Sequence, residues 1–353
     1  MRIIRRPVDS DHAADSSRVA ALPCVLTIGN FDGVHLGHQA LLSAVVERAR
    51  QRGILAALLS FWPHPQHFFA RRFPDRGITA PSRLSSRREQ WSMVARCGID
   101  RLFALRFDEK LALCPAETFI ARDLVSGMRV RHLVVGDDFR FGANRRGDFA
   151  MLVREGERWG FTVESIDSVL YNRKRVSSSQ VREALAQGRF DQAEALLGRP
   201  YTISGHVVHG RKLGRTLGFP TLNLRIDAES PALRGIFVVR VFGLQDEGAT
   251  AEAGVAGVAS LGTRPAVEAG GRFLLEVHLL DWSREVYGRI VHVEFLHKLR
   301  DEAHFPSLEA LRAQIEMDRN AAIAYQHPGA VNSRANPCVN PHVNPRVNPC
   351  VNP

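Results

Sequence analysis

The sequence has no run of apolar residues that approaches the length of about 20 needed to cross a lipid bilayer. Its N-terminus turns polar and acidic almost at once, without the unbroken apolar segment and small-residue cleavage site of a signal peptide. These absences argue against a membrane-spanning or secreted protein. We therefore expect a cytoplasmic protein that has no membrane partner.

Cysteine is also scarce. The chain has five cysteines among 353 residues, they are widely spaced, and no CxxC pair occurs. A disulfide framework usually shows an even number of cysteines, and a structural zinc site shows closely spaced ligands. We therefore expect isolated, reduced thiols.

Dense blocks of a single charge are missing. The net charge is +10, and the arginines that carry most of it are scattered along the chain. A basic protein can bind nucleic acid, but a protein that handles several polyphosphates needs positive potential as well. Because the sequence also lacks an aromatic RNA-binding signature, we expect no nucleic-acid partner.

The chain is long enough for two domains, and its first half alternates apolar strands with helical stretches. Strands joined by helices predict a parallel sheet with helical covers, whose ligands lie beyond the carboxyl ends of the strands. We expect a loop at residues 62–69. The expected strands are 22–30, 54–61, 100–107, 130–139 and 161–169, and the expected helices are 39–53, 82–98, 115–128 and 147–160.

The character of the chain changes after residue 177. Two short helices over 177–198 lead into a β-rich stretch, 201–299, whose frequent glycine turns predict a small antiparallel barrel closed by a helix at 307–325. Residues 335–353 then repeat an Asn-Pro unit every four positions, which forbids helix and central strand and predicts a disordered tail. The predicted domains are 1–183 and 184–325, followed by a tail at 326–353.

The most informative segment is Gly29 to His38, GNFDGVHLGH, which lies between an apolar run and a helix. His35 and His38 have i, i+3 spacing, so both imidazoles lie on one face of the first helical turn. Free backbone N–H groups and the helix dipole make that turn an anion site, most often for phosphate. Two histidines without nearby acidic or cysteine ligands suit phosphate better than a metal. The alternative is that they only cap the helix.

Three further polar motifs belong to the first half. SFWPHP, at 60–65, combines aromatic rings with prolines in a flat-walled loop that suits a planar ring. GDDFRFG, at 136–142, follows an expected strand, so Asp137 and Asp138 lie where a ligand would enter. Phe139 and Phe141 could line its pocket. SSSQVR, at 177–182, leads three hydroxyls into a helix whose Arg182 can reach phosphate, although serines at a helix start are often only caps.

The second half has a glycine-rich string, GHVVHGRKLGRTLGFPTLN, at 205–223. Glycines let a backbone approach phosphate closely, yet neither of the two common phosphate-loop patterns is present. Thr221 and Asn223 alternate on an extended segment and therefore share a face, where their oxygens suit Mg²⁺. Glu276 lies on an otherwise apolar strand, where a carboxylate is costly to bury unless it is used or paired.

These motifs resemble those of a known family. GNFDGVHLGH is similar to the HxGH signature of the nucleotidyltransferase superfamily, in the form used by bacterial bifunctional riboflavin kinase/FAD synthetases. SFWPHP, VGDDFRFG and VSSSQVR follow in the family's order, and GRTLGFPTLN resembles its riboflavin kinase signature. The resemblance covers roughly residues 20–320. It departs at LGTRPAV, where Ala266 stands in place of an expected threonine.

The resemblance implies a Rossmann-like nucleotidyltransferase domain followed by a barrel riboflavin kinase domain. It implies riboflavin, FMN and ATP as small-molecule substrates, FAD as product and Mg²⁺ as cofactor. The implied catalytic residues are His35, His38 and Arg182 for adenylyl transfer and Glu276 as the general base of the kinase. The implied ATP-binding residues are Gly29, Asn30, Phe31, Gly37, Ser178, Ser179, Gly205, Gly210, Gly214 and Arg215. The implied flavin-binding residues are Phe61, Trp62, Pro63, His64, Pro65, Asp138 and Phe139, and the implied metal ligands are Thr221 and Asn223.

Two other functions remain open from the sequence. An enzyme with only one of the activities, or with another nucleotidyl acceptor, would also carry HxGH, although the kinase motifs argue against it. A protein that binds RNA through its basic surface would show salt-sensitive RNA binding and no affinity for flavin.

Overall fold

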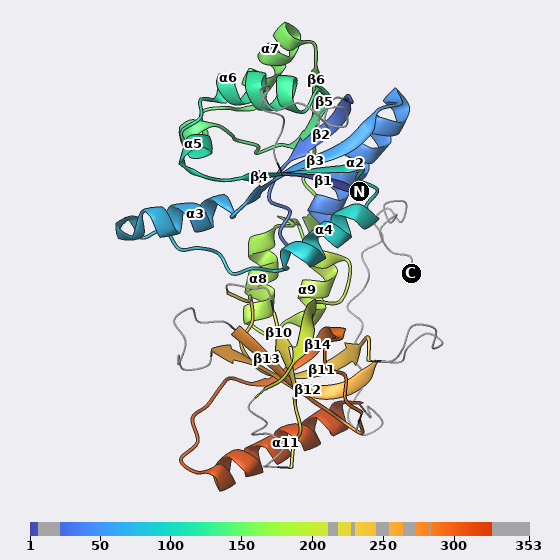
Figure 1. Ribbon diagram of the computed structural model, residues 1–353, viewed down its shortest axis with the longest axis vertical. Helices are drawn as coiled ribbons and strands as arrows, with labels where there is room; N and C mark the ends of the chain where they lie inside the picture. The colour runs from blue at the N-terminus through green and yellow to red at the C-terminus, as the bar shows by residue number, and fades with distance from the viewer. Residues whose placement is uncertain are drawn as a thin grey trace. The chain divides into compact units, whose positions relative to one another are not determined.

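The computed structural model describes residues 1–5, 22–210, 218–226, 230–244, 254–263, 273–282 and 284–326 (Figure 1). These residues form two compact units. The first is drawn from Met1–Pro81 and Gln90–Ser177, and the second from Ser82–Glu89 and the described residues that follow Ser177. The domain limits predicted from the sequence stay a prediction, and the Asn-Pro tail lies outside the described residues.

The first unit is built on a six-stranded sheet in which every pairing is parallel. Its strands are β1 (Arg2–Ile4), β2 (Cys24–Ile28), β3 (Leu55–Trp62), β4 (Arg101–Arg106), β5 (Val130–Gly136) and β6 (Thr162–Ile166). Across the sheet the order is β1-β4-β3-β2-β5-β6. The predicted parallel sheet with helical covers is confirmed.

Helices and turns connect these strands (Figure 1). They are α2 (Leu36–Arg52), α3 (Pro65–Arg72), the 3₁₀ turn η1 (Pro74–Arg76), α4 (Arg87–Arg96), α5 (Glu109–Ala112), α6 (Ala116–Thr118), the π-helix η2 (Phe119–Gly127), the 3₁₀ turn η3 (Ala143–Arg145) and α7 (Phe149–Trp159). A small antiparallel hairpin, β7 (Leu170–Tyr171) and β8 (Lys174–Arg175), follows β6.

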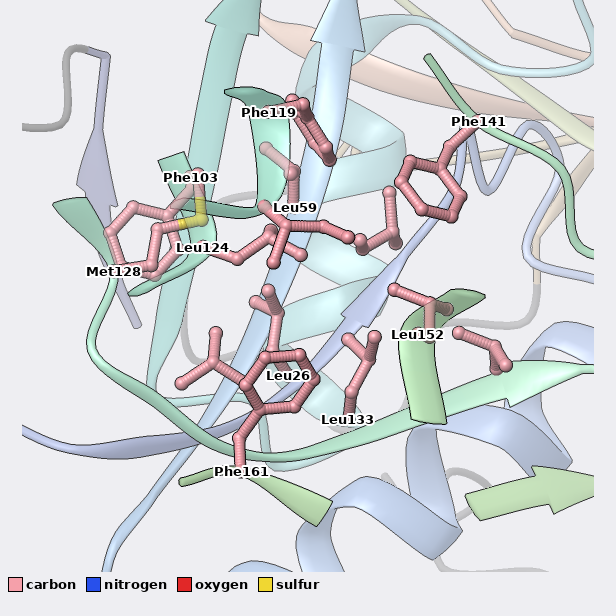
Figure 2. Close-up of a cluster of buried hydrophobic side chains, with 14 of the residues drawn as sticks. Leu26, Leu59, Phe103, Phe119, Leu124, Met128, Leu133, Phe141, Leu152 and Phe161 are labelled. Carbon is pink, nitrogen blue, oxygen red and sulfur yellow. The ribbon is translucent and has the colours of Figure 1, made fainter. Parts of the chain in front are cut away.

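The sheet carries a hydrophobic cluster on each face because successive strand residues point to opposite sides. Leu59 packs in one cluster with Leu26, Phe103 and the π-helix residues Ile120 and Leu124, as Figure 2 shows in part. The adjacent Leu58 packs in the other cluster, together with Val25 of β2, Leu42 and Val45 of α2 and Val94 of α4. This double burial explains why the central strands read as continuous apolar runs.

Several local features of the first unit differ from the sequence prediction. The helix expected at 82–98 spans only Arg87–Arg96, and neither α5 nor the β7–β8 hairpin was predicted. The loop expected at 62–69 is wrong from Pro65 onward, where α3 begins with proline at its first position and His64 as cap. The helix expected at 115–128 is a short α6 followed by the π-helix η2. β1 was not predicted, because three residues at a sheet edge are too short to show a periodic pattern.

The second unit contains a closed antiparallel barrel, which confirms the prediction. Its strands are β9 (Thr202–Val208), β10 (Leu222–Arg225), β11 (Gly235–Phe242), β12 (Val255–Thr263), β13 (Phe273–Leu279) and β14 (Ile290–Arg300), in the order β10-β13-β12-β11-β14-β9. Helices α8 (Ser178–Ala186) and α9 (Phe190–Leu197) precede the barrel, and α11 (Leu308–Gln326) follows it.

The strand β13 shows how the barrel is filled. Leu275 and Val277 are fully buried, whereas the alternating residues Leu274, Glu276 and His278 are only half-buried. Side chains alternate along a strand, so the second set points away from the barrel interior. Glu276 therefore lies on a surface that a ligand can reach.

The segment Ser82–Glu89 belongs to the second unit, although it lies within the first half of the sequence. The Arg83 N–H donates to the carbonyl oxygen of Ser230 at 2.7 Å, and the Ser204 N–H donates to Glu89 Oε1 at 2.6 Å. Ser86 and Glu89 also exchange hydrogen bonds at the start of α4. This reciprocal pair is a capping box, so the segment ends in a well-defined helix start.

Candidate active sites

The parallel sheet of the first unit changes direction beside β2. From β2 the chain passes outward through β3 and β4, then returns to β5 on the other side of β2. Ligands of open parallel sheets bind at such a switch point, beyond the carboxyl ends of the strands. Gly29 follows β2, Asp137 follows β5, and Trp62 ends β3. Three of the sequence motifs therefore begin at the edge of the sheet where a ligand is expected.

His35 and His38 come together at the first turn of α2. Their rings stack with centroids 3.6 Å apart and an angle of 16° between the planes. His35 caps the helix, because its Nδ1 accepts the His38 backbone N–H at 3.3 Å. A Cβ on Gly37 would lie 3.3 Å from atoms of the His35 ring and 3.5 Å from the Val176 carbonyl oxygen, so glycine leaves space for this arrangement.

The turn before the histidines is tightly built. Phe31 and Val34 have φ angles of 50° and 41°, in the left-handed region that non-glycine residues rarely adopt. The buried Gln90 donates its Nε2 to the carbonyl oxygen of Asn30. Asn30 Oδ1 is buried and has no hydrogen-bond partner among the described residues. The turn thus combines backbone strain with an unsatisfied acceptor, which is common at functional sites.

The aromatic segment that ends β3 is half-buried from Phe61 to Pro65. The Phe61 ring meets Phe107 edge to face, with centroids 5.9 Å apart. His64 Nδ1 accepts the Gln66 backbone N–H at 3.2 Å and so caps α3. The segment is held at both ends and leaves partly open aromatic surface.

Asp138 follows β5 and pairs with an arginine that the sequence analysis did not assign to a site. Arg175, on the β7–β8 hairpin, bonds the two Asp138 carboxylate oxygens at 2.8 and 2.6 Å. This hydrogen bond, with the positive charge, holds the pKa of Asp138 below its ordinary value. Phe139 stacks on Phe141 with ring centroids 5.6 Å apart. The run Arg173–Arg175 was the sequence signal that could have identified Arg175.

Ser178, Ser179 and Arg182 lie in the first turns of α8, within the second unit. Arg182 Nε donates to the carbonyl oxygen of Ser82 at 2.6 Å in the same unit. Any role of these residues at a nucleotide stays a prediction.

In the second unit, Asn223 of β10 and Glu276 of β13 are directly opposed cross-strand partners. Opposed residues share a face, so these side chains lie side by side, and Thr221 precedes them on that face by alternation. Asn223 is 7% exposed, and its Oδ1 has no hydrogen-bond partner in the described part of the chain. The structure therefore brings Glu276 beside Thr221 and Asn223, from which it is more than 50 residues away in the sequence.

Two glycines of the glycine-rich string pack closely against this site. A Cβ on Gly210 would overlap the Asn223 side chain, and a Cβ on Gly205 would lie 3.0 Å from the Arg225 carbonyl oxygen. No larger residue fits Gly210 without displacing Asn223. Gly214, Arg215 and the divergent Ala266 lie outside the described residues.

A cavity of about 500 Å³ opens beside these residues. His278, two positions after Glu276, lines it and holds the preceding segment in place, because its Nδ1 is 2.9 Å from the Pro220 carbonyl oxygen. This cavity was not predicted from the sequence, although Trp282 in LLDW, directly after the Glu276 strand, was an available aromatic signal. Its other lining residues include Phe219, Pro220, Trp282, Glu316 and Arg319.

The described cysteines are all buried and unbridged: Cys24, Cys97 and Cys114. Burial raises the pKa of the Cys24 thiol to about 12. Within the described ranges, no group of three His, Cys, Asp or Glu side chains is arranged to hold a metal ion. No helix in the same ranges combines the length and apolar character of a membrane span.

Each half of the chain matches a separate family model. The FAD synthetase model matches residues 18–180, and the riboflavin kinase model matches residues 197–326. A solved structure named as a macrolide-efflux protein from Streptococcus pneumoniae has a TM-score of 0.69 and 26% identity, and the match covers 91% of this chain and 98% of that chain. We take from this last likeness only the fold.

Curated relatives match both halves together. The bifunctional riboflavin kinase/FMN adenylyltransferase of Escherichia coli strain K12 is 46% identical over 299 residues, which are 85% of this chain and 91% of the relative. The protein of the same description from Pseudomonas fluorescens is 46% identical over 307 residues, which are 87% and 94% of the two chains. By this identity over nearly its whole length, the chain belongs to the family of bifunctional riboflavin kinase/FMN adenylyltransferases.

Proposed function

We propose that the chain phosphorylates riboflavin to FMN with ATP and then adenylylates FMN to FAD with a second ATP. Adenylyl transfer is the activity of the N-terminal domain and phosphoryl transfer that of the C-terminal domain. The observation that carries the proposal is that the chain matches bifunctional relatives over both halves, while each half holds its own polar site. We assign the two activities to domains 1–183 and 184–325.

In adenylyl transfer, an FMN phosphate oxygen attacks the α-phosphorus of ATP and pyrophosphate leaves. The protein needs no nucleophile, so catalysis is positioning and stabilisation of the transition-state charge. His35 and His38 contact the phosphates at the positive end of α2, and Arg182 assists them. The stacked rings and the glycine at position 37 support this role. Gly29, Asn30, Phe31, Gly37, Ser178 and Ser179 bind the rest of the nucleotide.

FMN lies against the aromatic segment Phe61–Pro65, with Asp138 and Phe139 on the far side of the switch point. The half-buried rings supply flat apolar surface for the flavin. Arg175 keeps Asp138 ionised, so that this carboxylate can accept hydrogen bonds from the ligand.

In phosphoryl transfer, Glu276 takes the proton from the terminal ribityl hydroxyl of riboflavin. The hydroxyl oxygen then attacks the γ-phosphorus of ATP, and ADP leaves. A half-buried carboxylate on a strand whose other residues, apart from His278, are apolar supports this assignment. Gly205, Gly210, Gly214 and Arg215 approach the ATP phosphates.

Thr221 and Asn223 fit a magnesium ion. Asn223 presents a buried amide oxygen that has no hydrogen-bond partner among the described residues. The neighbouring Thr221 and Glu276 also carry oxygen atoms of the kind that coordinate Mg²⁺. Mg²⁺ usually takes only one or two protein ligands when nucleotide phosphates supply others, so a larger acidic cluster is not needed. When bound, the ion neutralises developing charge on the transferred phosphate.

The cavity beside His278 accepts the isoalloxazine ring of riboflavin. Its volume of about 500 Å³ lies in the usual range of small-molecule sites. Phe219 and Trp282 supply aromatic lining. Pro220 also lines the cavity, and Thr221 is the next residue in the chain.

The decisive experiment incubates the purified protein with riboflavin, excess ATP and Mg²⁺ and separates the flavins by chromatography over time. FMN followed by FAD is the expected result. FMN alone would mean that the first unit is inactive or serves another acceptor. Unchanged riboflavin, with supplied FMN also unchanged in a second run, would contradict the proposal.

A further inference from the structure

One wall of the cavity is formed by a helix. Glu316 and Arg319 of α11 line it, together with Phe219 and Pro220 of the chain that leads into β10. The shape and charge of the cavity therefore depend on where α11 lies along the barrel.

Apolar packing alone does not fix that position well. Ala322 of α11 is fully buried in a small cluster with Val238 and Leu280, and half-buried side chains such as Leu299 and Ile323 surround it. Hydrophobic contact is non-directional. A helix held only in this way could rotate or shift on the barrel at small cost.

A directional contact joins α11 to the end of β14. Arg300 Nε and Nη2 donate to Asp318 Oδ1 and Oδ2 at 3.0 and 2.7 Å, and Gln314 Nε2 donates to Asp318 Oδ1 at 3.0 Å. The Asp318 side chain is 7% exposed. The Arg300 guanidinium also bonds the Asp301 carbonyl oxygen and lies over the Phe305 ring. A bidentate arginine–carboxylate pair fixes both distance and orientation.

We propose that Arg300 and Asp318 are positioning residues for riboflavin. Asp318 lies between Glu316 and Arg319 on α11, so the ion pair sets the helix register that presents both residues to the cavity. The pair itself does not line the cavity. This inference rests on the proposed kinase function and on the assignment of the cavity to the flavin.

The direct test is Asp318→Asn in the full-length protein. Asparagine keeps the shape and one acceptor oxygen for Gln314, but it loses the charge and one acceptor of the fork. We expect the KM for riboflavin to rise about tenfold, with kcat and the KM for ATP within about twofold, because only the binding of flavin is disturbed. The conversion of supplied FMN to FAD serves as an internal control and stays unchanged.

A matched control removes a comparable ion pair from the first unit. Glu164 of β6 bonds Arg48 of α2 in a bidentate manner, with both distances 2.8 Å. Glu164→Gln should leave the KM for riboflavin unchanged. An equal rise in that KM in both variants would mean that any weakened ion pair has this effect, and it would overturn the proposal.

Coupling between residues separates a positioning role from a general loss of stability. Arg319→Ala should raise the KM for riboflavin by itself. In the Asp318→Asn background it should add little, because Arg319 is already displaced. If the double variant instead raises the KM for riboflavin by the product of the two single effects, Asp318 acts independently of the cavity wall and the proposal is overturned.

The remaining outcomes are also decisive. If Asp318→Asn does not fold, Arg300→Lys is measured in its place. Lysine keeps the positive charge but loses the two-pronged contact with Asp318, so we expect a smaller rise in the KM for riboflavin. If the wild-type protein makes FMN but a folded variant has an unchanged KM for riboflavin, the inference is contradicted. Wild-type protein that makes no FMN would instead contradict the proposed function.

Discussion

The two sites of this chain are assembled in different ways. In the first unit the histidines proposed to bind phosphate lie within one short segment, where a strand, a strained turn and the first turn of α2 follow one another. In the second unit Asn223 and Glu276 meet only because β10 pairs with β13. The histidine segment of the first site is local in sequence and depends on helix capping, whereas the second site depends on closure of the barrel. Substitutions should therefore act differently in the two units.

The largest expected effect is the loss of kinase activity in Glu276→Gln. Removing the proposed general base should slow the formation of FMN by at least about 100-fold. Synthesis of FAD from supplied FMN should continue at the wild-type rate, because that site is built from other residues. The two rates are measured separately by flavin chromatography, and normal phosphorylation of riboflavin by the variant would remove Glu276 as the base.

His38→Ala should produce the opposite pattern. Losing one of the two histidines proposed to bind phosphate should slow the formation of FAD by about 100- to 1,000-fold, while FMN still accumulates from riboflavin. The same chromatographic assay with riboflavin and ATP reports both products. An equal loss of FMN and FAD would contradict separate sites.

Gly210→Ala tests the close packing in the kinase site. The new Cβ would overlap the Asn223 side chain and displace its oxygen from the proposed magnesium position. We expect FMN formation to fall roughly 10- to 100-fold, with a greater Mg²⁺ requirement. Titrating Mg²⁺ at fixed ATP measures this change. Gly160→Ala would not serve as a control for this substitution, because Gly160 has a left-handed φ of 74° and an alanine there would strain the backbone instead.

A histidine in the first unit should make its stability depend on pH. His132 Nδ1 lies 2.6 Å from Thr162 Oγ1 and 3.3 Å from Arg52, and its Nε2 lies 3.1 Å from Glu164. Burial lowers the pKa of His132 below its ordinary 6.5, and Arg52 contributes to the shift. The unfolded chain therefore binds the proton more readily, and stability falls as the pH drops below about 6.5.

We expect the melting temperature of the first unit to fall by about 2–4 °C between pH 7.5 and 5.5. His132→Gln should flatten this dependence. Thermal unfolding followed at several pH values measures it, and an identical slope in the variant would exclude His132 as the cause. Arg48 holds the pKa of the neighbouring Glu164 below its ordinary 4.5, so the contribution of Glu164 is lost only at lower pH.

In the second unit, one carboxyl group should make stability depend on pH in the opposite direction. Burial raises the pKa of Glu294, on β14, above its ordinary 4.5. Its stabilising effect is present at low pH and is lost as the pH rises through the raised value. Glu294→Gln should therefore raise the melting temperature of this unit at pH 7 by about 1–2 °C, the smallest of these effects. No gain at pH 7, or an equal gain at pH 4, would disagree with this account.

Much of the architecture could be predicted because periodic patterns survive in single sequences. Continuous apolar runs such as Leu55–Trp62 indicate strands buried on both faces, and the alternation along Phe273–Leu279 indicates a strand with one buried face. The start of α3 at Pro65 was missed because two nearby prolines suggested a loop. The cavity wall on α11 was missed because nothing local distinguishes Glu316 and Arg319 from other charged helix residues.

The sequence by itself determined the family, the parallel sheet and the antiparallel barrel, and it identified the turn at Gly29–His38 as the proposed phosphate site, because these depend on local order and spacing. Tertiary structure alone decided the pairing of Arg175 with Asp138, the alignment of Asn223 with Glu276 and the contact of Arg300 with Asp318. Each joins residues from separate elements. Such contacts depend on strand register and helix docking, which buried side chains set collectively and no single stretch of sequence specifies.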